Sequence, residues 1–142
     1  IDLTCGESES KFHSVADAVK KAKEEGVPME KVTMSSDGQG SWSNYDAEGK
    51  LVEIGVSDVD TIYRQIVYMV KEENMDLEEL LALGTKNPAM ALELYPKKGA
   101  VKEESDADIL IMNEDLSLDT VIAMGVPMMR DGKILKKGTY EK

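Results

Sequence analysis

The sequence predicts an α/β chain in two parts, with strands and helices in residues 1–95 and a small β-rich segment in residues 96–142. Three observations lead to this prediction. Before residue 95, apolar residues recur at helical spacing in several stretches. Two short β-like runs, at residues 1–4 and 32–36, flank the first of these stretches. After Tyr95-Pro96 the apolar runs become short and β-like, and turn residues separate them.

The composition is that of a globular protein, with 42% apolar and 32% charged residues over a length that suits one ordinary domain. No stretch approaches ~20 uninterrupted apolar residues, and the start, at Ile1, lacks the pattern of a signal peptide. The formal charge of −11 argues against nucleic-acid and membrane-surface binding. Cys5 is the only cysteine, which excludes an internal disulfide and predicts a reducing, cytoplasmic location.

The first 36 residues have the size of a strand–helix–strand unit. Residues 1–4 are compatible with the end of a strand. The spacing of Ser14 and Asp17 predicts a helix start with reciprocal capping, and Gly26 supplies the stop. Residues 32–36 then form the second predicted strand.

The next segment, residues 38–57, contains four glycines and is expected to be a long loop. Loops of more than about 12 to 15 residues without structure of their own are usually functional. Asp58 is expected to cap an amphipathic helix that runs to Val70.

Two shorter helices and a set of β strands complete the chain. Asp76 with Glu79 predicts the start of a helix over residues 77–83, and Asn87-Pro88 opens another that runs to Leu94. Asp131-Gly132 predicts a tight hairpin turn. The predicted strands are residues 109–112, 120–124 and 126–129, with the hairpin turn followed by residues 133–135.

Two parallel strands with helices on one side bury too little surface to offset the conformational entropy that the chain loses on folding. The pattern suits the last two βα units of a (β/α)8 barrel, which normally needs about 250 residues. Catalytic groups in such barrels lie at the C-terminal ends of the strands. Asp37 occupies this position after residues 32–36, and Gly38 and Gly40 allow the backbone to approach a substrate.

Three local patterns resemble amidohydrolases, and isoaspartyl dipeptidases (β-aspartyl peptidases) in particular. Residues 32–41, V-T-M-S-S-D-G-Q-G-S, are similar to that family's eighth barrel strand and its catalytic loop. Residues 46–56 resemble the family's long loop before the last barrel helix. D-A-D-I-L-I at 106–111 and K-G-T-Y at 137–140 resemble the return into a small β domain, a pattern shared across the superfamily.

The resemblance implies the C-terminal part of a metal-dependent hydrolase. Residues 1–95 would be the C-terminal part of the amidohydrolase TIM barrel, and residues 96–142 the C-terminal part of a small β-sandwich domain. The N-terminal remainder of the barrel would be a partner of this chain, and the intact enzyme would form a homo-oligomer.

The resemblance also implies roles for four residues in hydrolysing β-aspartyl (isopeptide) dipeptides. Asp37 would be the catalytic proton shuttle for a hydroxide that bridges two zinc ions, and it is a candidate ligand of one metal. Ser41 would bind a carboxylate of the dipeptide substrate. Gly38 and Gly40 would shape the loop and let it close over the substrate.

The histidine count limits the activity expected of these 142 residues. The family's dinuclear site takes several histidines and a carboxylated lysine from earlier strands, whereas this sequence has only His13. His13 lies in a polar stretch, where a solvated or capping role is expected. We therefore expect the 142-residue chain alone to be inactive.

Two other interpretations remain open at this stage. The same fold could act on another substrate, as a dihydroorotase-like enzyme or a deacetylase does. Alternatively, the chain could be a non-catalytic β-rich interaction module that keeps parts of a barrel. In that case Ser35 to Gly38 would be only a turn, and Asp37 would tolerate substitution.

Overall fold

The computed structural model describes residues 1–6 and 9–138 of the chain. A parallel strand pair lies at its centre, formed by β1 (Asp2–Thr4) and β2 (Thr33–Ser35). The crossover between them contains α1 (Glu9–Glu24) and the 3-10 turn η1 (Met29–Lys31). The predicted strand–helix–strand unit is therefore present, and Gly26 adopts the positive φ of 72° expected where the helix stops.

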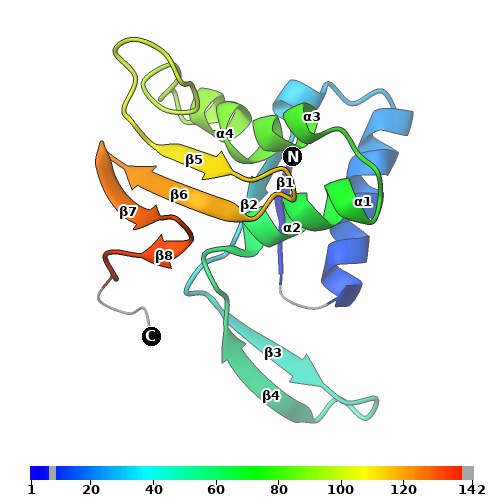
Figure 1. Ribbon diagram of the computed structural model, residues 1–142. Helices are drawn as coiled ribbons and strands as arrows, with labels where there is room; N and C mark the ends of the chain where they lie inside the picture. Colours follow the sequence, from blue (N-terminus) through cyan, green and yellow to red (C-terminus); the bar gives the residue numbers. More distant parts are fainter. Residues whose placement is uncertain (7–8, 139–142) are drawn as a thin grey trace.

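Three further helices pack with α1 on one side of the strand pair (Figure 1). They are α2 (Thr61–Lys71), α3 (Leu77–Gly84) and α4 (Lys86–Ala91). Met34 of β2 enters the core that these helices share, and Leu3 of β1 packs against it. The buried core consists of Cys5, Val15, Ala16, Val19, Val32, Met34, Ile66, Met69, Leu80 and Leu83.

Because side chains alternate along a strand, the residues on either side of Leu3 and Met34 point away from these helices. These residues are Asp2 and Thr4 on β1, and Thr33 and Ser35 on β2. We call them the polar face of the strand pair. Asp2 and Thr4 are exposed, and the two β2 residues are partly exposed.

Two of the predicted helix starts are wrong. The first helix begins at Glu9, and the hydroxyl of Ser14 donates to the carbonyl of Lys11 within that helix instead of capping it. The second helix begins at Thr61 and not directly after Asp58. The Ser57 N–H still donates to the Gly40 carbonyl of the preceding loop, and residues 59–60 form a turn before the helix. The Asp76 cap is confirmed, since its carboxylate accepts the Glu79 N–H at 2.9 Å.

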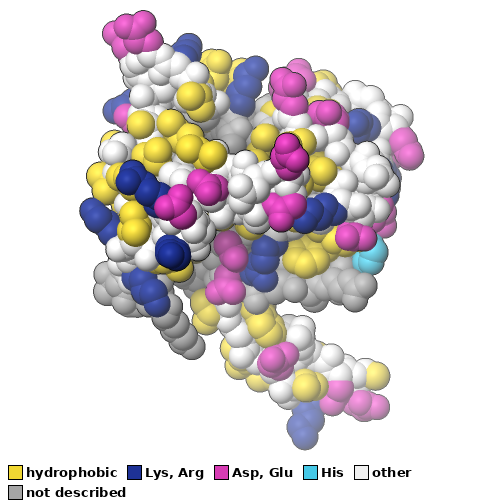
Figure 2. Space-filling view, viewed as in Figure 1, with side chains coloured by type: hydrophobic (Ala, Val, Ile, Leu, Met, Phe, Trp, Pro, Cys, Tyr) yellow, Lys and Arg dark blue, Asp and Glu magenta, His cyan; other side chains and the backbone are white. Residues whose placement is uncertain are grey.

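Residues 41–56 form a β-hairpin, so the prediction of a long irregular loop is wrong. β3 (Ser41–Tyr45) pairs antiparallel with β4 (Leu51–Val56), and the Asp46 carboxylate accepts two backbone N–H groups of the turn. The hairpin projects from the body of the molecule and carries apolar side chains on its surface (Figures 1 and 2). Three side chains of β4 are more than 60% exposed: Val52, Ile54 and Val56.

The C-terminal residues form a four-stranded antiparallel sheet at the side of the helices (Figure 1). The predicted Asp131-Gly132 turn is confirmed, with φ of 50° and 70°, the two positive values that a tight hairpin turn of this kind needs. The strands, in sheet order, are β5 (Ile109–Met112), β6 (Leu118–Ala123), β7 (Val126–Arg130) and β8 (Lys133–Ile134).

A cleft of about 200 Å³ separates this sheet from α2 and α3, and its walls are mostly apolar. The Tyr63 hydroxyl of α2 donates to the carbonyl of Leu116 across it, at 2.8 Å. Within residues 1–6 and 9–138, no helix is long and apolar enough to cross a membrane.

Candidate functional site

Asp37 lies two residues beyond β2, at the C-terminal end of that strand. Its backbone has a φ of 48°, in the left-handed region that aspartate and asparagine tolerate better than most residues. The side chain is exposed, and its carboxylate makes no hydrogen bond or ion pair with the described residues. Both carboxylate oxygens are therefore available to a proton, a substrate or a metal ion.

The two loop glycines make room for Asp37 and for the chain beside it. The Gly40 N–H donates to the Asp37 carbonyl at 2.8 Å. A Cβ on Gly40 would lie 2.8 Å from both that carbonyl oxygen and the Asp37 Oδ1. A Cβ on Gly38 would lie 2.8 Å from Cγ1 of Val59 and 3.0 Å from the Ser36 Oγ. Neither position accepts a larger residue without displacing its neighbours.

The loop is fixed to the base of the hairpin by two backbone hydrogen bonds. Gln39 N–H donates to the Ser57 carbonyl at 2.8 Å, and Ser57 N–H donates to the Gly40 carbonyl at 2.9 Å. Ser41 follows as the first residue of β3 and is exposed, and its hydroxyl makes no hydrogen bond to the described residues. Asp37, Gly38, Gly40 and Ser41 thus lie together in one clamped loop.

Asp2, for which the sequence predicts no role, joins β1 to β2 next to the loop. Asp2 Oδ1 accepts the Thr33 hydroxyl and Oδ2 accepts the Ser35 hydroxyl, both at 2.6 Å. All three side chains belong to the polar face. The alternation of hydroxyl residues at 33 and 35 places both on one face of β2, but it does not identify Asp2 as their partner.

The chemistry of the loop suits a metal site only in part. Carboxylate oxygen is an ordinary zinc ligand, and the Asp37 carboxylate is free to act as one. However, the described part of the chain contains no group of three or more His, Cys, Asp or Glu side chains placed to hold a metal ion. Asp37 therefore fits a metal site only as one ligand, and the other ligands would have to come from residues outside those described.

Cys5, next to β1, is buried and shows no sign of reactivity. Burial, helped by the nearby Asp2 carboxylate, raises the pKa of its thiol to about 11. A thiol with such a pKa is protonated at neutral pH and is a poor nucleophile. Its place in the buried core gives Cys5 a structural role.

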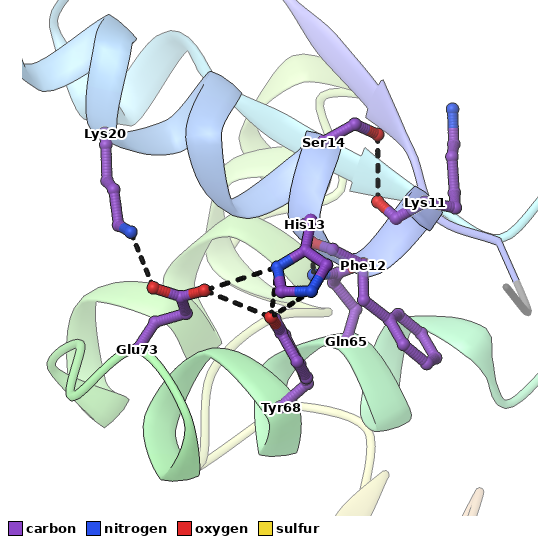
Figure 3. Close-up of polar contacts among 8 residues, drawn as sticks. All are labelled: Lys11, Phe12, His13, Ser14, Lys20, Gln65, Tyr68 and Glu73. Carbon is purple, nitrogen blue, oxygen red and sulfur yellow. Dashed lines mark hydrogen bonds and ion pairs between the residues drawn. The ribbon is translucent and has the colours of Figure 1, made fainter. Parts of the chain in front are cut away.

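His13 caps no helix but joins α1 to α2 (Figure 3). Its ring is about half exposed, its Nδ1 lies 2.6 Å from the Tyr68 hydroxyl, and the same nitrogen lies 3.7 Å from Glu73 Oε1. Lys20 donates to the other Glu73 oxygen at 2.6 Å. We call these four residues the α1–α2 clasp. It ties together helices of the outer layer and includes none of the loop residues.

A sequence profile described as the amidohydrolase family matches residues 2–135 of the chain. Among solved structures, the chain is similar to a β-aspartyl dipeptidase from Fervidobacterium islandicum AW-1, crystallised with a β-Asp-Leu dipeptide. The sequence identity is 34% and the TM-score 0.79, over 99% of this chain and 36% of that one. Residues 1–142 thus correspond to a portion of a barrel enzyme together with strands of its C-terminal sheet.

Two other similarities are more distant. A dihydroorotase from Methanosphaera stadtmanae is 30% identical over 88 residues, which are 62% of this chain and 17% of that protein. An N-acetylglucosamine-6-phosphate deacetylase from Pasteurella multocida has a TM-score of 0.62 at 18% identity, over 81% of this chain and 34% of that one, which supports the fold alone. The chain spans about a third or less of the length of each of these relatives.

Proposed function

The chain belongs to the amidohydrolase family, and from this we propose that it is part of a metal-dependent isoaspartyl dipeptidase that hydrolyses β-aspartyl dipeptides. The observation that carries the proposal is the free Asp37 carboxylate at the C-terminal end of β2. Barrel enzymes have their catalytic groups at this end of the strands. The similarity to a β-aspartyl dipeptidase over 99% of the chain supports the choice of substrate class.

In this proposal Asp37 moves the proton during peptide cleavage. Its carboxylate takes a proton from the attacking water and delivers it to the leaving amine, as general base and then general acid. The lack of a hydrogen bond to the described residues leaves its oxygens free for both steps. The clamp between Gln39, Gly40 and Ser57 limits the positions that the carboxylate can adopt.

Ser41 is the proposed substrate-binding residue. It follows Gly40 directly, and its hydroxyl is exposed and free to donate to a carboxylate of the dipeptide. A β-aspartyl dipeptide carries two carboxylates, so a hydroxyl donor beside the proton shuttle would help to orient the scissile bond. Gly38 and Gly40 keep this part of the loop narrow enough for the substrate to approach.

Among the described residues, Asp37 alone is proposed as a metal ligand. When bound, two divalent ions, zinc by the family resemblance, would polarise the scissile carbonyl and acidify the attacking water. Asp37 would hold one of them, and the other ligands would come from earlier barrel strands. Residues 1–95 would then be the end of the barrel, and residues 96–142 part of a small β-sandwich domain. An assembly of several identical subunits belongs to the same proposal.

The test is the substitution Asp37→Asn in the intact protein, assayed on β-Asp-Leu. Loss of the proton shuttle should lower kcat by about 10²–10⁴-fold, while the melting temperature stays near that of the wild type. Asp46→Asn is the matched control, because this carboxylate lies in the turn of the hairpin that follows the Asp37 loop and only shapes that turn. Wild-type turnover by a folded Asp37→Asn protein would instead indicate that residues 1–142 are a non-catalytic interaction module of the intact protein.

One observation favours a second candidate, an amidohydrolase with another substrate. The similarity to a dihydroorotase, 30% over 88 residues, falls within the same family. The intact protein should therefore be assayed with dihydroorotate beside β-Asp-Leu. If the protein turns over dihydroorotate and does not cleave β-Asp-Leu, the proposed substrate is wrong, but the proposed role of Asp37 in proton transfer still holds.

A further inference from the structure

The geometry points to Asp2 as a positioning residue for Asp37, acting through the hydroxyls of Thr33 and Ser35. This inference rests on the proposed function for its catalytic consequence. Its structural part, the fixing of the Asp37 loop by Asp2, stands on the hydrogen bonds alone. Asp2 belongs to the strand beside the one that carries Asp37, so it acts from outside the catalytic loop.

Asp2 uses both carboxylate oxygens to hold β2. Each oxygen accepts one hydroxyl at 2.6 Å, from Thr33 at the start of β2 and from Ser35 at its end. A hydrogen bond to an ionised acceptor is shorter and stronger than one between neutral groups. The parallel backbone pairing places Asp2 opposite Thr33 and Thr4 opposite Ser35, so Asp2 reaches along the strand to its last residue.

The bond to Ser35 supports one end of the segment that contains Asp37. Directly after Ser35, the Ser36 Oγ accepts the Gly38 N–H at 3.1 Å, which begins the turn. The other end is held by Ser57, through the backbone of Gln39 and Gly40. Asp37 therefore lies between two anchors, and Asp2 provides the one on the strand side.

The two hydrogen bonds to Asp2 also explain how a carboxylate can lie on the polar face. In a closed barrel this face points to the interior, where a charged group is costly unless it is well hydrogen-bonded. Two hydroxyl donors satisfy Asp2, and the Thr33 and Ser35 hydroxyls are thereby engaged with Asp2 and not with Asp37. The Asp37 carboxylate thereby remains free of competing local donors.

The experiment uses the intact protein and its variant Asp2→Ala, with two independent measurements. Amide hydrogen exchange of the peptide covering residues 36–41 should become about tenfold faster, since the hydrogen bond to Ser35 that supports one end of the loop is lost. On β-Asp-Leu, kcat should fall about tenfold with KM changed less than about twofold, since an imprecisely held proton shuttle slows chemistry more than binding. Zinc content per subunit should stay at the wild-type value.

Two further variants separate positioning from a general loss of stability. Asp2→Asn keeps an oxygen that can accept one hydroxyl and should recover part of the lost kcat. Ser35→Ala should reproduce most of the Asp2→Ala effect, and combining the two substitutions should add little.

The matched control is Asp115→Ala, which removes a carboxylate that also accepts a serine hydroxyl at 2.6 Å, but in the turn before β6. It should change neither the exchange of residues 36–41 nor kcat.

The outcomes separate this inference from the proposed function. If the wild-type protein does not cleave β-Asp-Leu, the proposed function fails, and the exchange measurement alone decides whether Asp2 fixes the loop. Unchanged exchange in Asp2→Ala overturns the inference in either case. Faster exchange with unchanged kcat in an active enzyme also overturns it, because Asp2 would then be structural only.

Discussion

Gly40 shows how closely one residue controls the position of Asp37. A methyl group at this position would lie 2.8 Å from the Asp37 carbonyl oxygen and from Oδ1, so one of the two residues has to move. The backbone of Gly40 does not need a positive φ, since none is found there. Its requirement for glycine is therefore steric, and it directly concerns the carboxylate of Asp37, the proposed proton shuttle.

The substitution Gly40→Ala should lower kcat on β-aspartyl dipeptides by about 10²-fold, because a displacement of about 1 Å at a reacting group can cost that much. The melting temperature should change little, since the loop is exposed. Gly49→Ala is the contrasting variant. A Cβ on Gly49 meets nothing within 4 Å, but the residue has a φ of 80°, which strains an alanine. It should lower stability by about 1 kcal/mol and leave kcat unchanged.

Steady-state kinetics and thermal unfolding of both variants check this prediction. A wild-type kcat in Gly40→Ala would show that the loop accommodates the added methyl group without displacing the Asp37 carboxylate. Such a result would weaken the role proposed for the clamp around Ser57, although it would leave the proton-transfer role of Asp37 open to its own test.

At the scale of single elements, the α1–α2 clasp links two helices through a charged pair that depends on pH. The hydrogen bond from Lys20 holds the pKa of the Glu73 carboxyl below its usual value, and the Tyr68 hydroxyl contributes in the same direction. Glu73 raises the pKa of Lys20 in return. Since the folded state favours the ionised carboxylate, the pair stabilises the fold above the unfolded pKa of glutamate, near 4.5.

We therefore expect Glu73→Gln to lower the melting temperature at neutral pH by a small amount. The difference from the protein with Glu73 should shrink as the pH falls below about 4.5, through the lowered folded pKa of Glu73, because the carboxylate then becomes protonated and its advantage is lost. Both proteins should carry His13→Gln, so that the carboxylate is the titrating group of the clasp. Melting curves from about pH 6 to about pH 3 measure the effect. If the difference in melting temperature between the two proteins grows toward low pH, ionised Glu73 does not stabilise the fold in the way proposed.

The elements that the sequence predicted correctly are those with a local chemical signal. The Asp76 cap and the Asp131-Gly132 turn depend on one or two residues whose hydrogen bonds or backbone angles are specific. The β3–β4 hairpin was missed because it buries little, so its apolar residues produce no pattern of a covered face. An aspartate and a glycine in the turn, between residues of alternating character, were the available signal.

The candidate site was predictable to a similar extent. The order of residues along the chain was enough to place Asp37 after a strand and beside two glycines. The tie from Asp2 to Thr33 and Ser35 was not, because it joins residues about thirty positions apart and depends on the register of two parallel strands. Such contacts follow from the fold and not from local sequence.

At the scale of the whole molecule, the strand pair has one face in the helical core and one polar face with no covering element among the described residues. A closed barrel places this polar face in its interior, next to strands from the rest of the protein. The free Asp37 carboxylate would point toward the same place. The polar face and the free carboxylate are thus both accounted for when the chain is one part of a larger barrel.

This leads to a prediction for residues 1–142 expressed alone. The described residues hold no cluster of three metal-binding side chains, and Asp37 alone would supply at most one ligand. The purified chain should bind far less than the two zinc ions expected for the intact enzyme, and it should not cleave β-Asp-Leu. Metal analysis and turnover would be measured beside the intact protein, with circular dichroism to verify that the helices have formed. Cleavage by a preparation free of intact enzyme would contradict the prediction. It would require a metal site, or a route without metal, within these 142 residues.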